Sequence, residues 1–173
     1  MKFLKSYTGA MVVLVVVIVL STLLGSHRSL TEARREVEAR FAPIAGDLQD
    51  CLDITANLLT VAERYLDGDR LSDLAESRET LAGSTDISDA YTAYQRLLGD
   101  AETVFLALED VSLSQREAEY VQGFRTDLAA EEDTISRDGY NAAAEAFNTE
   151  VLGGFPARLL GTLTFVRPAD TFP

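Results

Sequence analysis

The chain has little of the chemistry on which most enzymes depend. Its 173 residues include one cysteine, one histidine and no tryptophan. A single cysteine excludes an intrachain disulfide and a cysteine-based metal site. A single histidine excludes two-histidine zinc motifs and the paired Glu-x-x-His sequences of di-iron helical bundles. These absences disfavour most catalytic functions, so we expect no enzymatic activity, no cofactor and no metal ion.

Lysine is also scarce, because Lys2 and Lys5 are the only two and every later basic residue is one of 13 arginines. From Ser26 onward those 13 arginines face 28 carboxylates, which gives a net charge of −15. Nucleic-acid phosphates repel so acidic a domain, so nucleic acid is excluded as a partner. The composition has two explanations: adaptation to a saline habitat, or a GC-rich genome that encodes arginine in place of lysine.

Charge is absent from the stretch between Ser6 and Ser26, and its centre, Ala10–Leu20, is wholly apolar. A helix of roughly 20 apolar residues crosses the about 30 Å of a bilayer's hydrocarbon core. In lipid only a helix satisfies its own backbone hydrogen bonds within one segment. The sequence therefore predicts a short N-terminal tail (1–6) and a transmembrane signal anchor (7–26) that contacts the lipid bilayer.

The alternative for this segment is a signal peptide that is cleaved. A cut after Gly25 or Ser26 would place Leu23 or Leu24 where the peptidase requires a small residue. An uncleaved anchor is therefore the favoured interpretation.

The orientation of the anchor is less well determined by charge. Two lysines precede the span, and four arginines follow it within about 20 residues, so the count alone favours a cytoplasmic domain. Three of those arginines, however, lie among glutamates, and a short tail with two lysines is typical of an anchor whose N-terminus stays inside. We expect the domain to lie outside the cytoplasm.

Apolar residues after the anchor recur every three or four positions, which predicts helices throughout. A membrane-proximal helix is expected over 27–43, with a kink or a new helix start at Pro43. The first bundle helix is expected to begin at Ile44 and to end at Gly68.

Three further helices are expected over 70–81, 88–110 and 114–152. Ser112 or Ser114 is a candidate cap for the last of these, and Glu117 completes a capping box with Ser114. The pattern predicts an all-α fold, with an antiparallel bundle of three to four helices over 44–154 and an apolar C-terminal tail over 155–173.

Two aromatic–asparagine pairs, Tyr140-Asn141 and Phe147-Asn148, lie seven residues apart and so share one helix face. We expect both aromatic rings in the core. The asparagines have two interpretations: hydrogen bonds to a neighbouring helix, or recognition of a partner's backbone. Phe155-Pro156 predicts a helix stop and a chain reversal, with a ligand for another protein as the alternative.

This run of aromatic–asparagine pairs, Phe-Pro and apolar tail resembles the C-terminal signature of the LemA family. The stretch from Leu52 to Leu59, followed by a tyrosine, is similar to the family's first-helix motif, and its matching positions are Asp53, Asn57, Leu58 and Tyr65. The resemblance implies a membrane protein with one span, an all-α domain and no established catalytic activity.

We therefore expect a membrane-anchored, non-enzymatic scaffold or adaptor at the cell envelope. Its partners would be membrane or envelope proteins, or further copies of the chain in a homo-oligomer. The alternative is a helical bundle that senses a small molecule and signals through a partner.

Three further features have structural interpretations. Cys51 lies on the apolar stripe and is expected to be an inert core thiol. The run Glu131-Glu132-Asp133 is expected to be a solvated face. The tail from Leu159 to Phe172 is expected to pack over the bundle end, with docking on membrane or partner as the alternative.

Overall fold

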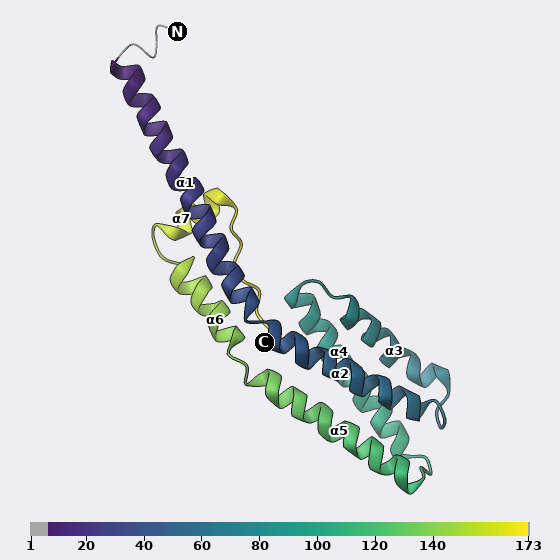
Figure 1. Cartoon of the computed structure of the whole chain (residues 1–173). Coiled ribbons are helices and arrows are strands. Elements are labelled where there is room, and N and C mark those ends of the chain that lie inside the picture. Colours follow the sequence, from purple (N-terminus) through teal and green to yellow (C-terminus); the bar gives the residue numbers. More distant parts are fainter. Residues whose placement is uncertain (1–6, 173) are drawn as a thin grey trace. The chain divides into compact units, whose positions relative to one another are not determined.

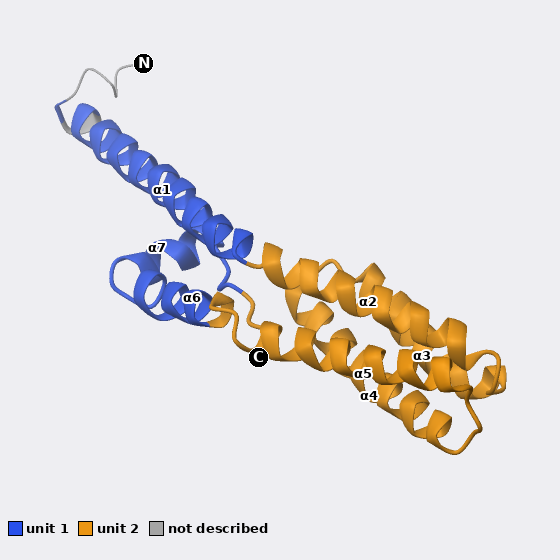
Figure 2. Ribbon diagram, turned by 60° about the horizontal axis from the view of Figure 1, so that its bottom comes forward, with its two compact units in different colours: residues 1–40, 142–169 blue, residues 41–141, 170–173 orange. Residues whose placement is uncertain are grey.

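The computed structural model describes residues 7–172, and all regular secondary structure in that range is helical. The all-α prediction is confirmed. The predicted N-terminal tail (1–6), with its two lysines, and Pro173 lie outside the described residues. The described chain forms two compact units (Figure 2): unit 1 contains residues 7–40 and 142–169, and unit 2 contains residues 41–141 and 170–172.

Helix α1 (Tyr7–Ala39), in unit 1, carries the predicted anchor and most of the predicted membrane-proximal segment without a break. Among the described residues it provides the one stretch apolar and long enough to span a membrane. The large apolar side chains from Met11 to Leu20 are each 41–55% exposed, so the helix is uncovered on every side there. Beyond Ser26 the helix turns polar, and Arg28 and Arg34 pair with glutamates one turn later at 2.9 and 2.8 Å.

Helix α2 (Ala42–Ala62) opens unit 2 and begins beside Pro43, which confirms the new helix start predicted there. Proline has no backbone N–H, and the first turn is where a helix does not need one. The buried face of α2 is the apolar stripe expected from the sequence. It consists of Ile44, Leu48, Cys51, Leu52, Thr55, Leu58, Leu59, Val61 and Ala62.

The other long helices of unit 2 are α3 (Gly68–Gly83), α4 (Ile87–Glu109) and α5 (Gln115–Ser136). Figure 1 shows them beside α2, which contacts all three, while α3 also packs along α4. Their core is leucine-rich, and Leu58, Leu74 and Leu97 are fully buried. Ser114 caps α5 by accepting the Glu117 N–H at 3.3 Å, so the capping prediction is confirmed for Ser114.

The prediction that Gly68 ends the first bundle helix is wrong. Helix α2 ends at Ala62, and Gly68 is the first residue of α3. Asp67 has an extended backbone (ψ 152°) in the N-cap position, and Asp69 places a carboxylate in the first turn, where the helix dipole favours negative charge. The Asp-Gly-Asp sequence is therefore a start signal here.

The prediction of one helix from 114 to 152 is also wrong. Helix α5 ends at Ser136, and the chain breaks before α6 (Tyr140–Ala146). The Asp138 carboxylate accepts the Tyr140 N–H at 2.7 Å and so caps a new helix. Gly139, a weak helix former, lies between them and adds to the break.

Helix α6 starts in unit 2 and continues in unit 1 as a π-helical turn, η2 (Phe147–Val151), in which the Leu152 N–H donates to Phe147 O at 2.9 Å. The helix then stops, as predicted, before a turn at Gly153-Gly154 and a cis Phe155–Pro156 peptide bond. The segment predicted as an apolar tail contains a further helix, α7 (Ala157–Thr164), which packs against α1 within unit 1.

The turn after η2 yields a first prediction. A Cβ atom added to Gly153 would lie 2.3 Å from Thr149 O, a backbone atom, so the turn would have to move. We expect Gly153→Ala to lower the free energy of unfolding by about 1–3 kcal/mol, as overpacking does elsewhere. The measurement is denaturant unfolding of the full chain in detergent micelles.

The neighbouring Gly154→Ala is the matched control. Its Cβ would lie 3.4 Å from Glu150 O, an ordinary contact, and we expect little change in stability. Equal losses in the two variants would contradict the steric explanation.

Candidate functional site

The first asparagine of the aromatic–asparagine pairs binds the backbone of the C-terminal segment within unit 2. The Phe172 N–H donates to Asn141 Oδ1 at 2.7 Å, and Asn141 Nδ2 donates to the Phe172 carbonyl in a short hydrogen bond. One side-chain amide thus satisfies both polar groups of one residue, as the neighbouring strand does in a β-sheet.

The second asparagine makes the same pair of bonds within unit 1. The Ala169 N–H donates to Asn148 Oδ1 at 2.7 Å, and Asn148 Nδ2 donates to the Ala169 carbonyl at 2.9 Å. Seven residues of helix rise by about 10 Å, and three residues of extended chain cover about 10 Å. The helix rise between Asn141 and Asn148 therefore matches the distance between two bound residues that lie three apart in sequence, such as Ala169 and Phe172.

Phe172 completes an aromatic cluster in unit 2. Its ring centroid lies 5.4 Å from that of Phe41, 5.1 Å from Tyr91 and 5.9 Å from Tyr94. Tyr140 contacts Phe41 edge-on at 5.3 Å, and its hydroxyl donates to the Asp170 carbonyl at 2.6 Å. Edge-to-face pairs of this kind stabilise a fold beyond the area that they bury.

These contacts decide how the sequence motif is used in this chain. Tyr140 and Phe147 are 1% and 2% exposed, so the prediction that they are core aromatics is confirmed. The asparagines hydrogen-bond the backbone of the chain's own C-terminal segment, which differs from both interpretations drawn from the sequence. Phe155, by contrast, is 88% exposed beside Pro156.

The residues of the second motif do not form one site. Leu58 is buried in the core, whereas Asn57 is exposed on α2 and Asp53 accepts a hydrogen bond from Gln49 at 3.1 Å. Tyr65 follows α2, and its hydroxyl donates to the Glu117 carboxylate at 2.5 Å.

Glu117, at the start of α5, accepts hydrogen bonds from several side chains. Its carboxylate accepts from the Ser114 hydroxyl, from Tyr65 and from Arg64, the last at 3.1 Å. These donors, Ser114 foremost, lower the pKa of Glu117 to about 2. The tyrosine of the motif thus ties the end of α2 to the start of α5.

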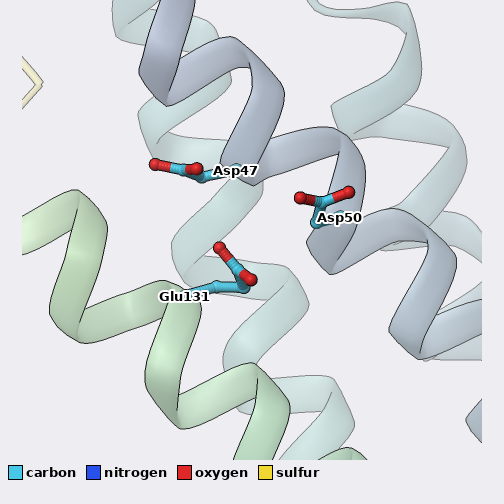
Figure 3. Close-up of side chains that lie close together, drawn as sticks. All are labelled: Asp47, Asp50 and Glu131. Atoms are coloured by element: carbon cyan, nitrogen blue, oxygen red, sulfur yellow. The ribbon is translucent and has the colours of Figure 1, made fainter.

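A carboxylate cluster lies between α2 and α5 (Figure 3). It comprises Asp47 and Asp50 on α2 and Glu131 on α5, and an oxygen from each lies within 4.8 Å of the others. Asp50 is exposed and the other two are partly buried. The expectation of a solvated face holds for the exposed Glu132 and Asp133, whereas Glu131 is partly buried because α5 turns that side chain toward α2.

Burial first, and then mutual repulsion, raise the pKa values of Asp47 and Glu131. Oxygen donors of this type suit hard divalent cations, although three carboxylates supply only part of the six to eight oxygens that calcium takes. The spacing of Asp47 and Asp50, three residues apart on one helix face, was visible in the sequence. The packing of α2 against α5 was not.

The single cysteine has no catalytic surroundings. Cys51 is fully buried, and burial together with the nearby carboxylates raises the pKa of its thiol to about 12. The thiol is therefore protonated at neutral pH and a poor nucleophile, as expected from its place on the apolar stripe.

Comparison of the chain with protein-family models, with curated proteins and with solved structures gave no match. Function is therefore argued from the residues and their geometry.

The asparagine contacts yield a second prediction. Asn141→Ala removes both hydrogen bonds to Phe172 and leaves two partly buried backbone groups unpaired. We expect the free energy of unfolding to fall by about 1–3 kcal/mol, and the Phe172 amide to lose its protection from hydrogen exchange. Asn57→Ala, at an exposed helical asparagine, is the control and should change stability by less than about 0.5 kcal/mol. Retained protection at Phe172 in Asn141→Ala would contradict the assigned role.

The carboxylate cluster yields a third prediction. Because the pKa of Glu131 is raised in the folded state, the folded chain binds the proton more tightly, and the group's contribution to stability falls as pH rises through the ordinary carboxyl range. Glu131→Gln should therefore raise the free energy of unfolding at pH 7, by up to about 1 kcal/mol, and lose this advantage at about pH 3, where carboxyl groups are protonated.

The control is Glu79→Gln, which removes the same charge from an exposed position on α3. Thermal unfolding of both variants at the two pH values separates local repulsion from the chain's overall negative charge. An equal gain in both variants would contradict the local explanation.

Proposed function

We propose that the chain is a single-pass membrane protein, anchored by residues 7–26, whose helical domain is a non-enzymatic scaffold or adaptor at the cell envelope. The observation that carries the proposal is the uncovered apolar surface of α1 from Met11 to Leu20. A core helix of a soluble protein covers its apolar side with protein. This helix presents apolar side chains all round, which suits a lipid environment.

The architecture of the domain supports a binding role. Short connections follow α2, α3 and α4. Helix α2 packs against α3 and α5, and α3 packs against α4, so we infer an antiparallel bundle for α2 to α5. The inferred likeness to the LemA family rests on the aromatic–asparagine pairs and the tail that they hold. The protonated, buried thiol of Cys51 supports a role without catalysis.

The topology that we propose places the domain outside the cytoplasm. The net negative charge between Glu32 and Glu150 keeps that part of the domain soluble and away from anionic lipid head groups on either side. Protease added to intact cells should then remove the domain, whereas a cytoplasmic domain would be degraded only after lysis.

Membrane fractionation tests the anchor. We expect the full chain to stay with the membrane in high salt and at alkaline pH, and intact-mass analysis to show that residues 1–26 are retained. Val16→Arg should release the chain from the membrane fraction, because a charge at the centre of a span costs about 2.5–3.5 kcal/mol. Val16→Leu is the control. A chain shortened at residue 25 or 26 and free in solution would contradict the proposal.

Cross-linking in intact membranes tests the scaffold role. Amine-reactive reagents are unsuitable, since no lysine follows Lys5. A photoreactive residue at Leu106 or Tyr120, apolar positions that are 53% and 45% exposed, is the suitable probe. Reproducible adducts at these sites, and not at the exposed Asp73, would support a specific partner. Their absence at every site would overturn the scaffold role.

A further inference from the structure

Helix α7 has an apolar face that no described part of the chain covers. Leu159 and Leu163, one turn apart, are 55% and 56% exposed. Phe155 precedes the helix, and Phe165 follows it in the left-handed region (φ 58°) with 90% of its surface exposed. A bulky aromatic residue is rare in that conformation, and an apolar face of this kind needs an occupant.

The opposite side of α7 fixes where the helix lies. Gly161 is buried, and a Cβ added to it would lie 3.0 Å from Leu152 Cδ2 and 3.9 Å from Leu30 Cδ1 on α1. Leu30 follows Ser26, the last residue of the uncharged stretch, by four residues, or about 6 Å of helix. The interfacial layer on each side of the hydrocarbon core is about 5–8 Å thick. If α1 spans a bilayer, the contact with Gly161 lies at the level of the lipid head groups.

Charge along the chain is consistent with that level. The sequence has 28 acidic residues, yet none occurs before Glu32 or between Val151 and Ala169. These are the two longest stretches without an acid, and in unit 1 they pack against each other through α1 and α7. Arg158 and Arg167 are exposed in the second stretch and carry the opposite charge to acidic lipid head groups, whereas Arg28 in the first stretch pairs with Glu32.

From these three observations we propose that α7 is an interfacial helix, which lies on the bilayer beside the anchor with Leu159 and Leu163 among the acyl chains. Arg158 in the helix and Arg167 just after it then lie at acidic lipid head groups. Short amphipathic helices with a cationic polar side bind membranes in this way. The inference rests on the proposed membrane anchor. It goes further by assigning a second lipid-binding element and a preference for anionic lipid.

The absence of tryptophan allows a clean test. Leu163→Trp in the full chain, reconstituted into vesicles, gives a single fluorophore. We expect blue-shifted emission and strong quenching by lipids brominated on the acyl chain near the head group. Val16→Trp reports on the anchor and should be quenched by lipids brominated deep in the chain. Ala39→Trp, at the far end of α1 and about 20 Å beyond Ser26, should emit as in water.

The three probes separate the two hypotheses. Quenching at Val16→Trp without quenching at Leu163→Trp would overturn the interfacial helix and leave the anchor intact, and it would indicate that another protein covers α7. No quenching at either position would overturn the proposed membrane anchor as well. Circular dichroism of each variant confirms that the helices are retained.

Lipid composition tests the charge component. In vesicles of phosphatidylcholine with phosphatidylglycerol, quenching at Leu163→Trp should exceed that in phosphatidylcholine alone. Adding Arg158→Gln and Arg167→Gln should abolish the difference and leave quenching at Val16→Trp unchanged. Equal quenching in both lipids before the arginines are replaced would overturn the preference for anionic lipid.

Discussion

The exposed apolar surface of α1 is the feature on which the interpretation of the rest of this molecule depends. The side chains from Met11 to Leu20 expose about half of their surface on every side of α1, and each square ångström left in water costs about 25 cal/mol. Lipid removes that cost without requiring any protein contact. In the membrane arrangement that we propose, the same requirement accounts for the distribution of charge, because carboxylates are unfavourable beside a bilayer and no acidic residue occurs before Glu32 or between Val151 and Ala169.

Within the helical domain, side-chain amides hold a segment that has no regular secondary structure. Asn141 and Asn148 each pair with both backbone groups of one residue, so the segment is bound through its main chain. Phe172 is also held by its side chain, because its ring packs among the aromatic side chains of unit 2. Backbone pairing fixes the register, and the ring supplies the apolar burial.

Much of this was predictable from periodicity, because burial on one face of a helix leaves a repeat of three to four residues. That signal predicted the buried stripe of α2, whereas an uninterrupted apolar run predicted the membrane anchor and a capping box predicted the cap at Ser114. Periodicity failed at Gly68, a residue type that can begin a helix as well as end one. It also failed at Asp138, whose side chain accepts the Tyr140 N–H where a new helix starts. The carboxylate cluster and the asparagine contacts depend on which segments meet, and no single-segment pattern carries that information. The motif nevertheless marked both asparagines as residues with a special role.

The two compact units are interleaved along the polypeptide. Unit 2 needs residues near 172 to complete its aromatic cluster, yet all of 142–169 in unit 1 comes first. During synthesis, the ring partners of Phe172 stay partly solvated until residues 142–169 and then Phe172 itself have been synthesised. The entropic cost of closing a loop grows only slowly with its length. The late completion of the aromatic cluster therefore follows from the order in which residues are synthesised and not from the cost of closing the loop. Dissection of this protein into autonomous fragments would therefore leave one of them incomplete wherever a single cut is made.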